Sequence, residues 1–118
     1  MFARINDHKF KVKPVFTPKE IQKGMMNRKF DDSFDGMLFF MNDEDLHCFW
    51  MKNCIISLDI VFISDDEITK IHHSCPPCNS DDCKNYCGYG DKVLELPSGT
   101  CKKKGISVGD KKIGRAHV

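Results

Sequence analysis

The sequence predicts a single, mainly β domain (α+β), a compact antiparallel sandwich or barrel with one N-terminal helix and one or two short helical turns. The first observation is size, because 118 residues of which 41% are hydrophobic suit one core rather than two. The second is a series of short β-rich segments about ten residues apart, a spacing that favours antiparallel strands over alternating βαβ units. The third is that no apolar run approaches the ~18 residues of a membrane span.

The first expected elements are a strand and a helix. In residues 9–15 apolar residues alternate with lysines, which indicates a strand, and Pro14 favours a position at the edge of the sheet. Thr17 is a suitable N-cap for the helix that follows, and Glu20 completes a capping box. Gly24 inside this helix predicts close packing against the sheet, since glycine otherwise costs helical stability.

Further β-rich segments follow, each bounded by polar turn residues. They are residues 37–41, 47–52, 57–63, 67–73 and 92–96. We expect a helical turn over residues 100–105 and a short strand after residue 110. If segments 47–52 and 57–63 pair as a hairpin, one of its faces is a plain core face. That face carries Phe49, Met51, Leu58, Ile60 and Phe62.

Composition and charge limit the possible classes of function. The net charge of +1 gives no general reason to expect nucleic acid or a membrane as partner, which leaves a small ligand or a protein. Charge is segregated, because residues 1–30 carry eight basic and two acidic residues and residues 31–67 carry one basic and ten acidic residues. The N-terminal segment lacks the apolar core of a signal peptide, so the sequence predicts a cytoplasmic or host-cell interior location.

Several motifs occur in an order that resembles a known family. They are GMM from Gly24, GMLFF from Gly36, FWMKN from Phe49, LDIVFI from Leu58, VLELPSG from Val93 and GISVGD from Gly105. From about residue 9 to residue 113 the chain resembles the domain of unknown function 192 family. The resemblance implies a small, mostly antiparallel β domain with short helices and no established biochemical activity. Many relatives look exported, and some have two cysteines in the loop before the VLEL strand.

The cysteines suggest a metal site. Four of the seven fall within thirteen residues: Cys75, Cys78, Cys83 and Cys87. In a reducing compartment such clustering favours metal binding over disulfides. The first two flank a Pro-Pro turn, and residues 80–88 read as a short helix that would place the last two on one face. Four thiolates that converge on one ion form a closed site, so we expect a structural zinc.

Other states of these cysteines remain open. They could form a pair of disulfides, or stay reduced in a surface loop over residues 74–90 that is inserted between strands. A third alternative is a thiol–disulfide redox protein that acts through Cys75 and Cys78, although the antiparallel context does not supply the helix that such a pair needs. The other cysteines are expected to be buried, inert thiols. They are Cys48, Cys54 and Cys101.

The second face of the expected hairpin combines Trp50 with polar side chains, and two interpretations compete. In the structural one, Lys52 and Asp59 form an ion pair, or Asp59 accepts hydrogen bonds from backbone N–H groups of the Asn53 loop. In the functional interpretation, a ligand pocket beside Glu95 is lined by Trp50, Lys52, Asn53 and Asp59. The sequence has no nucleophile with an adjacent base, no paired catalytic carboxylates and no phosphate loop. A non-enzymatic binding or structural module is therefore favoured.

Overall fold

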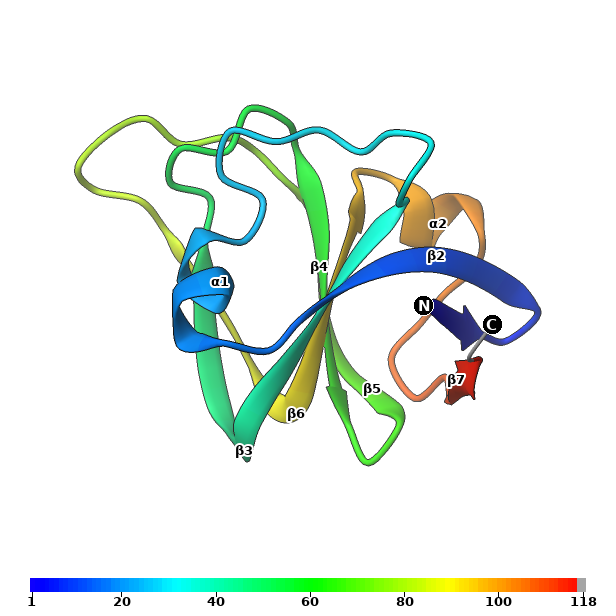
Figure 1. Cartoon of the computed structure of the whole chain (residues 1–118). Coiled ribbons are helices and arrows are strands. Elements are labelled where there is room, and N and C mark those ends of the chain that lie inside the picture. Colours follow the sequence, from blue (N-terminus) through cyan, green and yellow to red (C-terminus); the bar gives the residue numbers. More distant parts are fainter. Residues whose placement is uncertain (117–118) are drawn as a thin grey trace.

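The computed structural model describes residues 1–116, with side chains up to residue 112, and these residues form one sheet of seven strands with two short helices (Figure 1). The elements in chain order are β1 (Phe2–Ile5), β2 (His8–Val15), α1 (Pro18–Lys23), β3 (Gly36–Trp50), β4 (Leu58–Ser64), β5 (Glu67–Cys75), β6 (Asn85–Pro97), α2 (Thr100–Lys103) and β7 (Lys112–Ala116). The strand order is β5-β4-β6-β3-β2-β1-β7. Neighbouring strands run antiparallel except for β2 and β3, which are parallel.

The sheet curls until its two edge strands approach one another. The backbone N–H of Ile68, in β5, donates to the carbonyl of Asp110 at 2.9 Å, and the N–H of Lys112, in β7, donates to the carbonyl of Asp66 at 2.8 Å. The predicted mainly β class is confirmed. Of the expected sandwich or barrel, the sandwich of two sheets does not form, because all the described strands belong to this one sheet, which curls as a half-barrel. In the described residues no helix is long and apolar enough to cross a membrane.

Strand pairing differs from the prediction at the centre of the sheet. β6 lies between β3 and β4, so the expected hairpin of residues 47–52 with 57–63 is wrong. The reason is that β6 is much longer than the predicted strand at residues 92–96, and it pairs with β3 on one side and with β4 on the other. The segment with Pro14 is also not at an edge, since β1, which was not predicted, pairs with β2.

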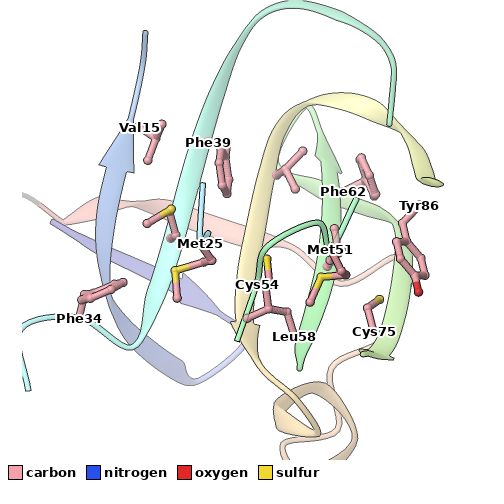
Figure 2. Close-up of a cluster of buried hydrophobic side chains, with 13 residues drawn as sticks. Val15, Met25, Phe34, Phe39, Met51, Cys54, Leu58, Phe62, Cys75 and Tyr86 are labelled. Carbon is pink, nitrogen blue, oxygen red and sulfur yellow. The ribbon is translucent and has the colours of Figure 1, made fainter. Parts of the chain in front are cut away.

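Alternate side chains of the central strands enter two hydrophobic cores, one on each face of the sheet. We call the cluster beneath α1 the first core and the cluster beneath α2 the second core. Figure 2 shows part of the first core, including Met25, Phe39, Met51 and Cys54. The predicted core face is confirmed although its pairing was wrong, because the alternation of side chains belongs to each strand whatever its partner.

The short helix α1 covers the first core. The Thr17 hydroxyl accepts a hydrogen bond from the Glu20 backbone N–H at 3.2 Å, and the Glu20 carboxylate accepts one from the Thr17 N–H at 3.4 Å. The helix ends at Gly24, whose φ of 47° suits glycine. A Cβ atom there would lie 3.3 Å from the Phe39 ring, so Gly24 also allows α1 to sit close to the sheet. The next residue, Met25, is then buried in the first core.

Candidate functional site

Strand β6 places a carboxyl group inside the first core. Glu95 follows Val93 on the same face of β6, and Val93 is a member of this core. In the sheet Glu95 lies between Met37 of β3 and Ile60 of β4, and its side chain is only 3% exposed. Within the described part of the chain, no group forms a hydrogen bond or ion pair with its carboxyl. Native proteins satisfy most buried polar groups, so this one calls for an explanation.

Burial in this apolar layer decides the charge of Glu95. The loss of hydration disfavours the carboxylate and raises the pKa of Glu95 from 4.5 to about 8. The side chain therefore carries its proton at neutral pH. A protonated carboxyl both donates and accepts hydrogen bonds, which makes it a versatile group to hold a ligand.

A cavity of about 270 Å³ lies beside Glu95. For comparison, a cavity of ~150 Å³ is enough for one benzene ring. Its walls come from the end of α1 and the residues after it, from β3 and from the loop after β3. They are Ile21, Gln22, Lys23, Gly24, Met25, Met26, Phe39, Met41, His47, Cys48, Phe49, Trp50 and Cys54. We call this cavity the Glu95 pocket.

Glu95 is the one acidic side chain on these walls, and the other ionisable groups are placed differently. Lys23 is exposed at the end of α1. His47 faces Asp43, whose carbonyl oxygen lies 3.1 Å and whose carboxylate lies 3.3 Å from the His47 Nε2 atom. Burial raises the pKa of the Cys54 thiol to about 11, so it stays protonated. Glu95 is thus the one buried polar side chain on walls that are otherwise mostly apolar.

Only part of the predicted pocket is brought together. Trp50 and Glu95 both line the cavity, and Trp50 is 44% exposed. Lys52 is directed to another loop, where its ammonium group donates to the carbonyl of Ser80. Asn53 forms a turn with a φ of 61° and does not line the pocket.

Asp59 is buried on the opposite face of the sheet, the face on which Val61 and Ile63 of β4 enter the second core. Its carboxylate accepts three backbone hydrogen bonds, which join the end of β5 to the start of α2. The donors are Ser74 at 2.8 Å, Gly99 at 3.2 Å and Cys101 at 2.9 Å. The expected ion pair with Lys52 is therefore wrong. Backbone N–H groups do satisfy Asp59, but they come from these segments and not from the Asn53 loop.

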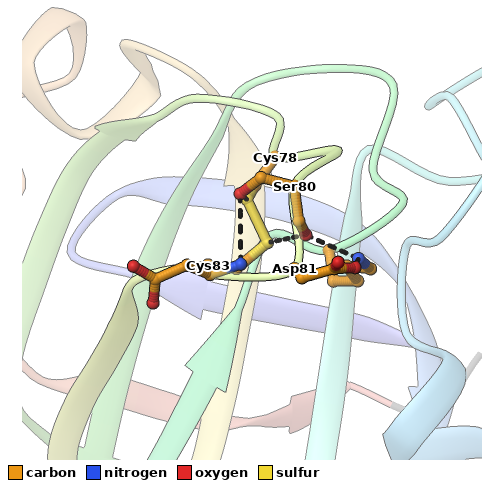
Figure 3. Close-up of a disulfide and its surroundings, with 6 residues drawn as sticks. Cys78, Ser80, Asp81 and Cys83 are labelled. Carbon is orange, nitrogen blue, oxygen red and sulfur yellow. Dashed lines mark hydrogen bonds and ion pairs between the residues drawn. A yellow bond between two sulfur atoms is a disulfide. The ribbon is translucent and has the colours of Figure 1, made fainter.

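The four clustered cysteines do not converge on one point. Cys78 is bonded to Cys83 within the loop, as Figure 3 shows, and Cys87 is bonded to Cys48 across β6 and β3. Cys75 is a buried free thiol. In the described residues no three His, Cys, Asp or Glu side chains are grouped to hold a metal ion, so zinc at this loop has no support. The reason is that the expected helix does not form, since β6 begins two residues before Cys87.

The remaining predictions about cysteines have mixed outcomes. The expected redox pair is not formed, because Cys78 has another partner and burial raises the pKa of the Cys75 thiol to about 11. Cys54 and Cys101 are buried free thiols, as predicted. Cys48 is not, because it is exposed and disulfide-bonded. Its disulfide joins the two central strands at the wall of the Glu95 pocket.

The apolar walls of the pocket were not predicted. The sequence placed Phe49 on a predicted core face, and only its position at the wall of a cavity distinguishes it from an ordinary core residue. One signal was available in the VLELP segment, where Glu95 stands between Leu94 and Leu96 in a strand whose two faces are both buried. An acidic residue at such a position indicates either a satisfied buried carboxylate or a site.

Comparisons with known proteins agree with the fold and give no activity. Two solved structures are similar over nearly the whole chain. A protein of unknown function from Novosphingobium aromaticivorans DSM 12444 has a TM-score of 0.84 and 30% identity, over 97% of this chain and 84% of its own. A putative transcription regulator from Sinorhizobium meliloti 1021 has a TM-score of 0.83 and 31% identity, over 96% of this chain and 92% of its own.

The search of curated proteins gave no match. The family described as "Uncharacterized ACR", domain of unknown function 192, matches residues 1–113. The chain therefore belongs to the domain of unknown function 192 family.

Proposed function

We propose that this protein is a non-enzymatic binding module that takes a small, largely apolar ligand into the Glu95 pocket. The observation that carries the proposal is that the Glu95 carboxyl is buried beside a cavity and has no partner in the described chain. Ligand sites are typically apolar cavities with a small number of fixed polar groups, and this pocket has that composition. A ligand that enters this pocket meets a protonated carboxyl that can both donate and accept a hydrogen bond.

The same walls argue against catalysis. Cys54 is the one nucleophilic side chain that the described walls offer, and the raised pKa of its thiol leaves very little thiolate at neutral pH. His47 is engaged by Asp43 through its Nε2 atom. A site that binds without reaction is the simpler assignment.

The pocket can be tested without knowledge of the natural ligand. Benzyl alcohol is a neutral probe with one ring and one hydrogen-bonding group, and its binding is followed by amide chemical shifts in ¹⁵N-labelled protein. We expect saturable shifts at Met25, Phe39 and Cys54, together with a change in the fluorescence of Trp50, the single tryptophan. The absence of saturable shifts, or shifts confined to the loop around Pro76, where a second cavity of about 360 Å³ lies, would overturn the proposal.

A matched pair of variants provides the control. Cys54→Leu adds volume at the wall of the Glu95 pocket, whereas Cys101→Leu adds the same volume in the second core. Both are first checked for a cooperative thermal transition. We expect Cys54→Leu to weaken benzyl alcohol binding at least fivefold and Cys101→Leu to leave it unchanged. Equal binding to both variants would show that the probe binds elsewhere.

A further inference from the structure

The described walls of the Glu95 pocket hold a buried acidic group and no buried basic side chain, which limits the class of ligand. Glu95 is the one carboxyl group on the described walls, and its side chain is buried. The basic group Lys23 is exposed at the end of α1, away from the buried carboxyl. A ligand that brings an anion into this pocket would meet a carboxyl and no buried cation, whereas a ligand cation would meet its natural partner.

The walls also suit a cation. Phe39, Phe49 and Trp50 line the pocket together with three methionines, Met25, Met26 and Met41. The faces of aromatic rings carry negative potential and attract ammonium groups, most strongly where water is excluded. Methionine sulfur and aromatic rings also accommodate varied apolar shapes. The pocket therefore combines one carboxyl with an aromatic lining for the body of the ligand.

We propose that the ligand of this pocket is an organic cation, an ammonium group carried on a small apolar or aromatic body, and that its charge pairs with Glu95. This inference rests on the proposed function, since it names the class of ligand for the same pocket. The neutral, hydrogen-bonded ligand is the alternative that the experiment must exclude.

Binding of such a ligand exchanges one proton for one organic cation. In the free protein the Glu95 carboxyl is neutral near pH 7, because burial holds its pKa at about 8. When the ammonium group enters, the O–H bond of Glu95 breaks, the proton passes to bulk water, and the ligand keeps its own hydrogens. The pocket has zero net charge before and after the exchange, so no uncompensated charge is buried at either stage.

Few other groups contribute to this exchange. The thiols of Cys54 and Cys75 both interact electrostatically with Glu95, and burial raises the pKa of each to about 11, so they remain neutral below pH 8. The other titratable groups on the walls are His47 and Lys23, and neither forms an ion pair with Glu95. The proton that is released on binding is therefore expected to come from Glu95.

The test uses three probes of similar size that differ in charge: benzylamine, benzyl alcohol and benzoate. Their affinities for the unmodified protein are measured by calorimetry from pH 6 to pH 8. At pH 8 we expect benzylamine to bind more tightly than the other two probes. Its affinity should rise about tenfold from pH 6 to pH 7 and level off above pH 8. In two buffers of different ionisation enthalpy at pH 7, its binding should release close to one proton.

The Glu95→Gln variant is the matched control, because an amide has nearly the shape of a neutral carboxyl and cannot ionise. It should lose the preference for benzylamine and the pH dependence but still bind benzyl alcohol. If this variant does not fold, proton release and pH dependence in the unmodified protein decide the question alone. If benzyl alcohol or benzoate binds more tightly than benzylamine at pH 8, or if the affinity for benzylamine does not depend on pH, the ligand is not a cation, although the pocket still binds ligands. If none of the three binds, the pocket itself is refuted.

Discussion

The Glu95→Gln variant tests the burial of Glu95 through the pH dependence of the free energy of unfolding, without any ligand. In the unfolded chain Glu95 ionises near its ordinary pKa of 4.5, while in the folded protein burial keeps the proton bound up to a pKa of about 8. Between these two values the unfolded state binds fewer protons than the folded state. The free energy of unfolding therefore falls as pH rises through this window. Below pH 4.5 the stability contribution is fully present, and above pH 8 it has been lost.

The magnitude follows from the two pKa values. The interval from 4.5 to about 8, at ~1.36 kcal/mol per pH unit, corresponds to a loss of about 5 kcal/mol in the free energy of unfolding. Typical domains have a total stability of ~5 to 15 kcal/mol, so the loss is a large fraction of the whole. Glutamine stays neutral at every pH, so Glu95→Gln should not share this loss. Between pH 5 and pH 8 the free energy of unfolding of the variant should therefore rise, relative to that of the unmodified protein, by ~1.4 kcal/mol per pH unit.

Urea unfolding of the disulfide-bonded protein, followed by the fluorescence of Trp50, measures this difference at each pH. Taking the difference between the two proteins cancels the titration of the other groups, which they share. Glu44→Gln is the control, because it makes the same substitution at an exposed side chain of β3. Parallel stability curves for Glu95→Gln and the unmodified protein from pH 5 to pH 8 would refute the burial argument.

Three further outcomes test other parts of the structure. Asp59→Asn should lower the free energy of unfolding by about 2 to 4 kcal/mol in urea titrations, because a neutral amide accepts hydrogen bonds from the three N–H donors less well than a carboxylate does. Near-normal stability would contradict the structural role of Asp59. Thiol titration of unfolded protein purified without reductant should find three free thiols, and seven after reduction, whereas seven in both would mean that the two disulfides are absent. Gly88→Ala should lower the free energy of unfolding by about 3 kcal/mol, and with it the melting temperature, because its Cβ would lie 2.3 Å from the Phe62 ring. An unchanged melting temperature would show that the strands are further apart.

The sequence predicted the features that depend on neighbours along the chain. The capping box of Thr17 and Glu20 forms because both partners lie within one helical turn. Gly24 lies against the Phe39 ring, so the predicted close packing is confirmed, although Gly24 caps the helix and does not lie inside it as predicted. The core face of β4 follows from alternation within one strand. Each of these signals is local, so it survives errors in the overall arrangement.

The prediction failed where distant segments decide the structure. The segment around Gly88 reads as a loop because glycine is rare in strand interiors, yet it is part of β6. The space at Gly88 is taken by the ring of Phe62, and at Gly90 by the backbone of Ile63, contacts that no local pattern reveals. Once this segment is a strand, Cys87 stands opposite Cys48, and the metal cluster gives way to a disulfide.

The two buried carboxyl groups of the central sheet show how such a structure separates a structural role from a binding role. Asp59 and Glu95 are both almost fully buried, in neighbouring strands that pair with each other. The fold supplies Asp59 with three backbone donors, so its hydrogen bonds are already made when the protein is folded. Glu95 receives none in the described chain and faces a cavity. A group that the fold leaves unsatisfied beside a cavity has bonding capacity to offer a ligand, and for this reason we place the binding site at Glu95.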